Sequence, residues 1–152
     1  MAGTKQDYLH SPIDDLESCF WVALWSVVFN KGHSEQLFSE DERRIRDNLA
    51  RAAKDNAGAC LVRLRPGHSN DIMKRFHPVL VAWWKVVRDE GARWDAEVLT
   101  MAPEGAGAEY YLPHFHISAL QGVVDVLEVM LRYWNGEISW ENWTASVPVT
   151  LH

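Results

Sequence analysis

The stretch SPIDDLESCFWVALWSVVF, residues 11–29, decides the fold that we predict for this chain of 152 residues. Its first eight positions are mostly polar or turn-forming, and the rest are almost all apolar. Pro12 disfavours helix at the residue before it, and Asp14 or Asp15 can cap a helix whose positive end favours acids. The NKG sequence at 30–32 is a helix-ending signal. The pattern therefore predicts a helix from about residue 14 to 29 with almost no polar face.

The composition is that of a globular protein, with 47% hydrophobic and 24% charged residues. The length fits one domain over residues 1–152. The net charge of −6 argues against a nucleic-acid partner that binds a basic surface. The basic residues clustered at 43–54 alternate with acids and are typical of a solvated helix face.

The two cysteines, Cys19 and Cys60, are too few for a disulfide framework, and their apolar neighbours predict small core residues. The first residues lack the pattern of a secretion leader. The apolar run at 19–29 is shorter than a membrane span, so we expect a cytoplasmic protein with no membrane partner.

A second helix is predicted where Ser39 and Glu42 form a capping box, followed by a narrow apolar stripe that includes Ile45 and Leu49. Gly58 should end this helix. A third helical region spans about 70–90, where Pro78 should divide it into a short and a longer piece.

Gly91 should end the third region, and the segment YYLPHFHI, residues 110–117, looks extended. A fourth helix is predicted from Ser118 to the Asn135-Gly136 stop. Apolar residues recur along it at helical intervals: Leu120, Val123, Val124, Leu127, Met130, Leu131 and Trp134. We therefore predict a mainly α fold of four to five helices around the hydrophobic helix at 14–29, with short extended segments.

His114 and His116 are the only closely spaced histidine pair. On an extended segment both rings would face one way and could form half of a zinc site. No third ligand is marked by the sequence, and partly exposed structural histidines are the commoner case. We therefore predict no metal site and no cofactor.

Eight tryptophans are unusual in a chain of this length. The adjacent pair Trp83 and Trp84 must point in different directions on a helix, and Trp140 and Trp143 lie one helical turn apart. Core filling is the simpler explanation, and an aromatic pocket or an interface is the functional one. These four tryptophans, with His114 and His116, are the candidate binding residues.

Three acids, Asp14, Asp15 and Glu17, lie at the start of the first predicted helix. Paired carboxylates can perform acid–base chemistry, but at a helix start capping is the simpler role. We therefore interpret Asp15 and Glu17 as structural anchors and predict no catalytic residues.

The Gly-Thr at residues 3–4 followed by the sequence at 10–29 resembles the C-terminal lobe of the fungal-specific protein kinase family. The residues that carry the resemblance are Asp15, Leu16, Glu17, Ser18, Cys19, Phe20, Trp21, Val22, Ala23 and Leu24. The resemblance implies that this helix is the central helix of the lobe, packed on all sides. It also implies that Asp15 holds the backbone of a catalytic loop.

The motifs of a kinase active site are missing from the sequence: a glycine-rich loop, a V-A-I-K lysine, an H-R-D loop and a D-F-G segment. Phosphoryl transfer needs these groups together, so this chain alone should not be a kinase. The leading hypothesis is a non-catalytic, kinase-lobe-like interaction or regulatory module that binds a protein partner or forms a homodimer. The alternative is a small enzyme or small-molecule binder with a tryptophan-rich pocket on the helical scaffold.

Overall fold

The computed structural model describes residue 11 and residues 13–30, 39–64 and 69–142. These residues form the α-helices α1 (Ile13–Val28), α2 (Glu40–Ala50), α3 (Lys54–Val62), α4 (Asp71–Arg93) and α5 (Ala108–Trp134), and the π-helix η1 (Trp94–Leu99). The predicted mainly α fold is confirmed. The short extended segments are wrong for the described ranges, which contain no strand.

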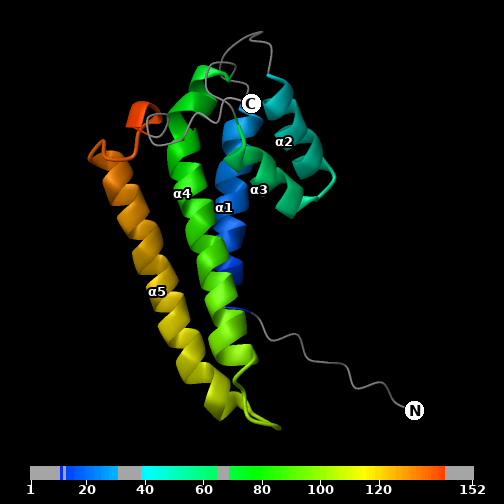
Figure 1. Ribbon diagram of the computed structural model, residues 1–152, viewed down its shortest axis with the longest axis vertical. Coiled ribbons are helices and arrows are strands. Elements are labelled where there is room, and N and C mark those ends of the chain that lie inside the picture. Colours follow the sequence, from blue (N-terminus) through cyan, green and yellow to red (C-terminus); the bar gives the residue numbers. More distant parts are fainter. Residues whose placement is uncertain (1–10, 12, 31–38, 65–68, 143–152) are drawn as a thin grey trace, which may run out of the picture.

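Three helices, α1, α4 and α5, run alongside one another, and the short helices α2 and α3 cover one side (Figure 1). Helix α4 packs against α1, α3, α5 and η1, and α1 packs against α2, α4 and α5. The core therefore lies where α1 and α4 meet beneath α3.

Helix α1 is not packed on all sides, which corrects the expectation drawn from the kinase resemblance. Its buried side chains are Ile13, Phe20, Trp21, Leu24 and Val28. Its other flank exposes Cys19, 67% of Val22 and 47% of Trp25 to solvent. The predicted core role of Cys19 is therefore wrong, whereas Cys60 is partly buried against the core. Because the helix has almost no polar face, part of its apolar surface is exposed to solvent.

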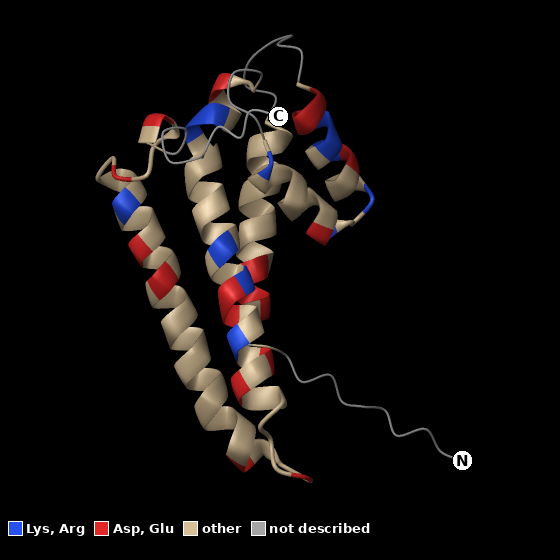
Figure 2. Cartoon of the chain, viewed as in Figure 1, with Lys and Arg blue, Asp and Glu red and all other residues tan. Residues whose placement is uncertain are grey.

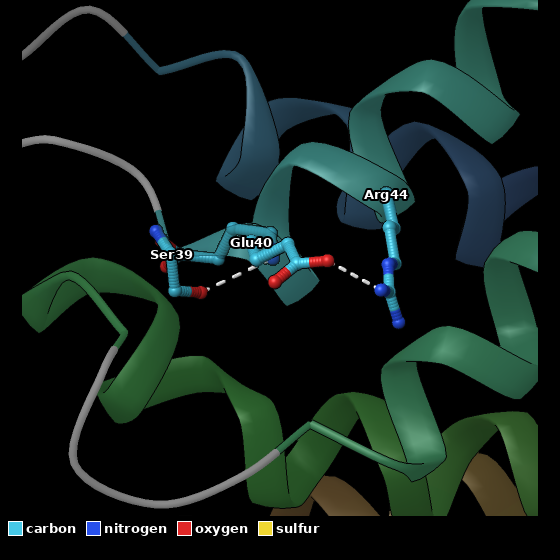
Figure 3. Close-up of polar contacts among 4 residues, drawn as sticks. Ser39, Glu40 and Arg44 are labelled. Carbon is cyan, nitrogen blue, oxygen red and sulfur yellow. Dashed lines mark hydrogen bonds and ion pairs between the residues drawn. The ribbon is translucent and has the colours of Figure 1, made fainter.

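Helix α2 begins at the predicted capping box. The backbone N–H of Glu42 donates to Ser39 Oγ at 3.2 Å, and the N–H of Ser39 donates to Glu42 Oε2 at 2.9 Å. An ion pair between Glu40 and Arg44 supports the exposed side of the first turn (Figure 3). The other oxygen of Glu42 accepts the N–H of Asn70 at 2.8 Å, which links the start of α2 to the cap of α4.

The sequence predicts that Gly58 ends the second helix, but Gly58 lies buried inside α3. Helix α2 ends earlier, at Ala50, and Ala52 just after it has a left-handed φ of 56°. A Cβ on Gly58 would lie 2.6 Å from ring carbons of Trp84, so glycine permits α3 to approach α4 closely. Trp84 in turn packs against Phe20 and Trp21, with centroid distances of 5.1 Å to each ring.

Helix α4 continues through Pro78 and Gly91, so both predicted interruptions are wrong. Proline removes one N–H donor from a helix and crowds the preceding turn. Here the hydroxyl of Tyr133, from the last turn of α5, donates to the carbonyl of Arg75 at 3.2 Å in that turn. This contact joins the last turn of α5 to the turn of α4 before the proline.

Helix α5 begins at Ala108, ten residues before the predicted start at Ser118. The segment 110–117, predicted to be extended, is helical and includes Pro113. The backbone of α5 comes close to α1 at Gly122, where an added Cβ would lie 2.5 Å from Cδ1 of Leu16.

Candidate interaction surface

The outward side of α5 carries a continuous row of exposed apolar side chains, which we call the outer stripe. Its residues are Ile117, Leu120, Val124, Leu127, Leu131 and Trp134. Their exposed fractions range from 48% for Val124 to 86% for Trp134. Isolated exposed apolar residues are common, but a contiguous patch of this kind marks an interaction site.

The spacing of the outer stripe places all six residues on one side of the helix. Their intervals alternate between three and four residues, which is the heptad pattern of helices that pack along a seam. The residues of α5 that are buried in the fold, Gly122, Val126 and Val129, lie on the opposite side. The fold therefore uses one face of α5 and leaves the other face without a partner among the described residues.

The outer stripe contains no charged residue. From 110 to 124 the helix has no Lys, Arg, Asp or Glu at all, and Figure 2 shows this length of α5 in the neutral colour. Asp125 accepts a hydrogen bond from Gln121 at 2.7 Å, and Arg132 pairs with Glu137 at 3.5 Å. The surface is therefore apolar along its length, with charges at its flanks.

The inner face of α5 is held by contacts that do not involve the stripe. Glu90 of α4 is 3% exposed, pairs with Arg93 at 2.8 Å, and lies near Gly122 and Asp125. Burial raises the pKa of Glu90, opposed by Arg93, and the nearby Asp125 carboxylate raises it further. Near the other end, the ring of Tyr133 stacks on Phe76 at 6.3 Å. The buried residues Gly122, Val126 and Val129 pack α5 against α4 and α1 on this inner face, so the stripe is not needed to hold the helix in place.

The structure contradicts the zinc half-site at His114 and His116. Both residues are exposed on an α-helix, where side chains two residues apart point in nearly opposite directions. Within the part of the chain that the structure describes, no group of three His, Cys, Asp or Glu side chains could hold a metal ion.

The buried histidine of the described chain is His77, on α4. Its Nε2 lies 2.8 Å from the carbonyl oxygen of Leu61, and its ring meets the edge of Trp140 at a centroid distance of 5.0 Å. Burial lowers the pKa of His77 to about 4, and the hydrogen bond to Leu61 opposes this shift. The histidine is therefore neutral and structural at pH 7.

The candidate tryptophans do not form one surface. Trp84 is buried, Trp83 is half-buried, and both rings pack against Phe20. Trp140 is half-buried against His77, and Trp143 lies outside the described residues. Core filling therefore accounts for the pair on α4, and the interface prediction finds no support in them.

The acids at the start of α1 have different roles. Ser11, rather than Asp14 or Asp15, caps the helix, because its Oγ accepts the N–H of Ile13 at 3.2 Å. Asp14 Oδ2 accepts the N–H of Ser11 at 3.0 Å. Glu17 Oε1 accepts the indole N–H of Trp21 at 2.7 Å, and Asp15 is exposed.

A cleft of about 700 Å³ lies between the start of α1, the first turn of α3, the second half of α4 and η1. Two buried tryptophans, Trp84 and Trp94, contribute to its wall. Its carboxylates belong to Asp14, Glu17, Asp55 and Asp95. Gly91 lines the cleft, and a Cβ added to it would meet no atom within 4 Å, so there is open space in the cleft beside this glycine.

The comparisons with known proteins assign no relative: no protein-family model, curated protein or solved structure matches this chain. Among the described residues, no helix combines the length and apolar character needed to cross a bilayer. The sequence predicted five of the six stripe residues, from Leu120 to Trp134, to be helical, but it placed Ile117 in an extended segment, which is wrong. Their alternating spacing was the available signal for a seam, but both faces of α5 are apolar and the spacing does not say which one is buried.

Proposed function

We propose that this protein is a non-catalytic interaction module that binds an apolar helix of a protein partner along the outer stripe of α5. The observation that carries the proposal is the position of the stripe. Six exposed apolar residues in a heptad pattern lie opposite the face that fastens α5 to the rest of the fold.

The free energy for such binding comes from removing the stripe from water, at about 25 cal/mol for each Å² of apolar surface. A partner helix with apolar residues at the same spacing can pack its side chains between those of the stripe, as two helices do along a coiled-coil seam. Helix α5 is already formed and fastened on its inner face, so binding does not need to fold it.

The kinase-lobe resemblance of residues 3–4 and 10–29 supports a regulatory role for this module, since the motifs of phosphoryl transfer are missing from the sequence. We expect the partner to be a protein rather than a nucleic acid, because the net charge is −6. We expect the module to work in the cytoplasm, without a cofactor.

A titration with a fluorescent designed helix that has leucine at its a and d positions tests the proposal. Fluorescence anisotropy should show binding to the unmodified chain. Replacing Leu120→Lys and Leu127→Lys together should weaken binding at least about tenfold, because each lysine puts a charge into the apolar seam. Circular dichroism should show an unchanged fold, since these side chains are 67% and 61% exposed.

The matched control is the pair Val22→Lys and Met101→Lys, which are 67% and 70% exposed but lie outside α5. This pair makes the same kind of change elsewhere on the surface and should leave binding unaltered. Equal loss in both variants, or no binding by the unmodified chain, would refute the outer stripe as the binding surface.

A second candidate function is the binding of a small organic cation in the cleft, favoured by its tryptophans and carboxylates. Catalysis is less well supported, because Glu17 is hydrogen-bonded to Trp21 and Asp55 pairs with Arg88 at 3.2 Å. A thermal-shift screen with aliphatic and aromatic amines and with ATP–Mg²⁺ tests this candidate. If an amine stabilises the unmodified chain and Gly91→Leu abolishes that stabilisation, cation binding in the cleft is supported. If no amine stabilises the chain, this candidate is rejected.

A further inference from the structure

We infer that the partner of the outer stripe is a second copy of this chain, with the two α5 helices packed antiparallel along their stripes. This inference rests on the proposed function and names its partner. A pair of identical surfaces related by a twofold axis is the commonest form of protein association. The outer stripe is suited to it because every position on the stripe finds an apolar position opposite.

The sizes of the stripe residues match in the antiparallel pairing. When the two stripes overlap along their whole length, Ile117 faces the partner's Trp134, Leu120 faces the partner's Leu131, and Val124 faces the partner's Leu127. The largest residue, Trp134, is thus paired with the smaller Ile117, so the layers differ less in volume than layers built from identical residues would. A parallel pairing would instead place Trp134 against Trp134 and Val124 against Val124.

The distribution of charge favours the same orientation. The chain from η1 to the start of α5 carries four acids and no base: Asp95, Glu97, Glu104 and Glu109. The far end of α5 is mixed in charge: Lys74 and Arg75 of α4 lie beside Trp134 together with Glu141, and Lys74 pairs with Asp71 at 3.8 Å. An antiparallel pair brings the acidic end of each copy toward this mixed end of the other rather than toward a second acidic end, and it also opposes the two helix dipoles. A parallel pair would bring the four acids of one copy beside the same four acids of the other.

The surface is large enough for a dimer. If each of the six side chains exposes on the order of 100 Å², the pair buries roughly 1,200 Å², the lower bound of a stable interface. The stripe covers 18 residues, which is short for an isolated coiled coil. Helix α5 is held by α4, however, so the pair does not depend on the intrinsic stability of two short helices.

The first experiment is the solution mass of the full chain, measured by light scattering over a series of concentrations. The mass should rise from 17.4 kDa toward twice that value as the concentration increases. The Leu120→Lys and Leu127→Lys variant should have a dissociation constant at least about tenfold higher, and the Val22→Lys and Met101→Lys control should match the unmodified chain. A mass of 17.4 kDa at every concentration would overturn the inference.

The second experiment determines the orientation by disulfide trapping in a Cys19→Ser, Cys60→Ser background. In an antiparallel seam the two e positions lie side by side, so a mixture of the Gln121→Cys and Glu128→Cys chains should form a cross-linked heterodimer. In a parallel seam a g position lies beside an e position, and a mixture of Val123→Cys and Glu128→Cys would cross-link instead. Cross-linking of the second mixture alone overturns the antiparallel arrangement.

The two proposals fail in different ways. A chain that binds the designed helix but stays monomeric refutes the pairing of two copies and leaves the interaction module standing. A chain that neither dimerises nor binds the designed helix refutes both.

Discussion

Two glycines inside helices, Gly58 in α3 and Gly91 in α4, have opposite surroundings, so the same substitution should have opposite effects on stability. A Cβ on Gly58 would lie 2.6 Å from two ring carbons of Trp84, whereas a Cβ on Gly91 would meet nothing within 4 Å. We expect Gly91→Ala to stabilise the protein and Gly58→Ala to destabilise it.

The magnitudes follow from two terms. Alanine is favoured over glycine in a helix interior by about 1 kcal/mol, and this gain applies at both positions. At Gly58 the Trp84 ring must move by about 1 Å to restore an ordinary contact distance. That ring is packed against Phe20 and Trp21, and overpacking of this kind costs about 1–3 kcal/mol. The two variants should therefore differ in unfolding free energy by roughly 1–3 kcal/mol.

Urea unfolding followed by circular dichroism at 222 nm measures both free energies. Gly122→Ala should fall between the two variants, because its close neighbour is the tip of the flexible Leu16 side chain, 2.5 Å away. Equal stabilisation by Gly58→Ala and Gly91→Ala would refute the close packing of α3 on Trp84.

Three further predictions concern single groups. The pKa of His77 is lowered from 6.5 to about 4, so the unfolded chain binds a proton first as the pH falls. The stability that His77 contributes should be complete above pH 6.5 and decrease by about 3 kcal/mol toward pH 4. Urea titrations should find this loss reduced in His77→Phe. Ser39→Ala removes the acceptor for Glu42 N–H and should cost about 1 kcal/mol of unfolding free energy in the same assay. Asp15→Asn should shift the thermal midpoint only slightly, at a cost below about 1 kcal/mol, because the charge of this exposed acid favours the start of the helix through the helix dipole; a larger loss would show that Asp15 anchors buried backbone.

Local signals predicted the start of α2 well, whereas α5 begins ten residues before its predicted start. The capping box at Ser39 and Glu42 was found from sequence because its partners lie three residues apart. The ends of α1 and α5 lie within two residues of the predicted stops, but the interruptions predicted at Gly58, Pro78 and Gly91 are wrong, because the effect of these residues depends on distant neighbours. Trp84 explains the first, and Tyr133 contacts the turn before the second.

The candidate site was predictable in part. The apolar spacing between Leu120 and Trp134 identified a helix, but Pro113 concealed its first ten residues. The sequence could not predict which face of the helix is buried. Val126 and Val129 on one face are as apolar as Leu127 and Leu131 on the other. Only the position of α4 and α1 decides which side is buried.

The carboxylate of Glu42 joins the starts of α2 and α4, since one oxygen accepts the N–H of Ser39 and the other accepts that of Asn70, 28 residues further along the chain than Glu42. Because the side chain is 1% exposed, water does not readily replace either bond when one helix frays. The first turns of α2 and α4 should therefore open in a single event. In native-state hydrogen exchange, amides in both turns would show one common opening free energy, which makes α2, α3 and the start of α4 one cooperative folding unit.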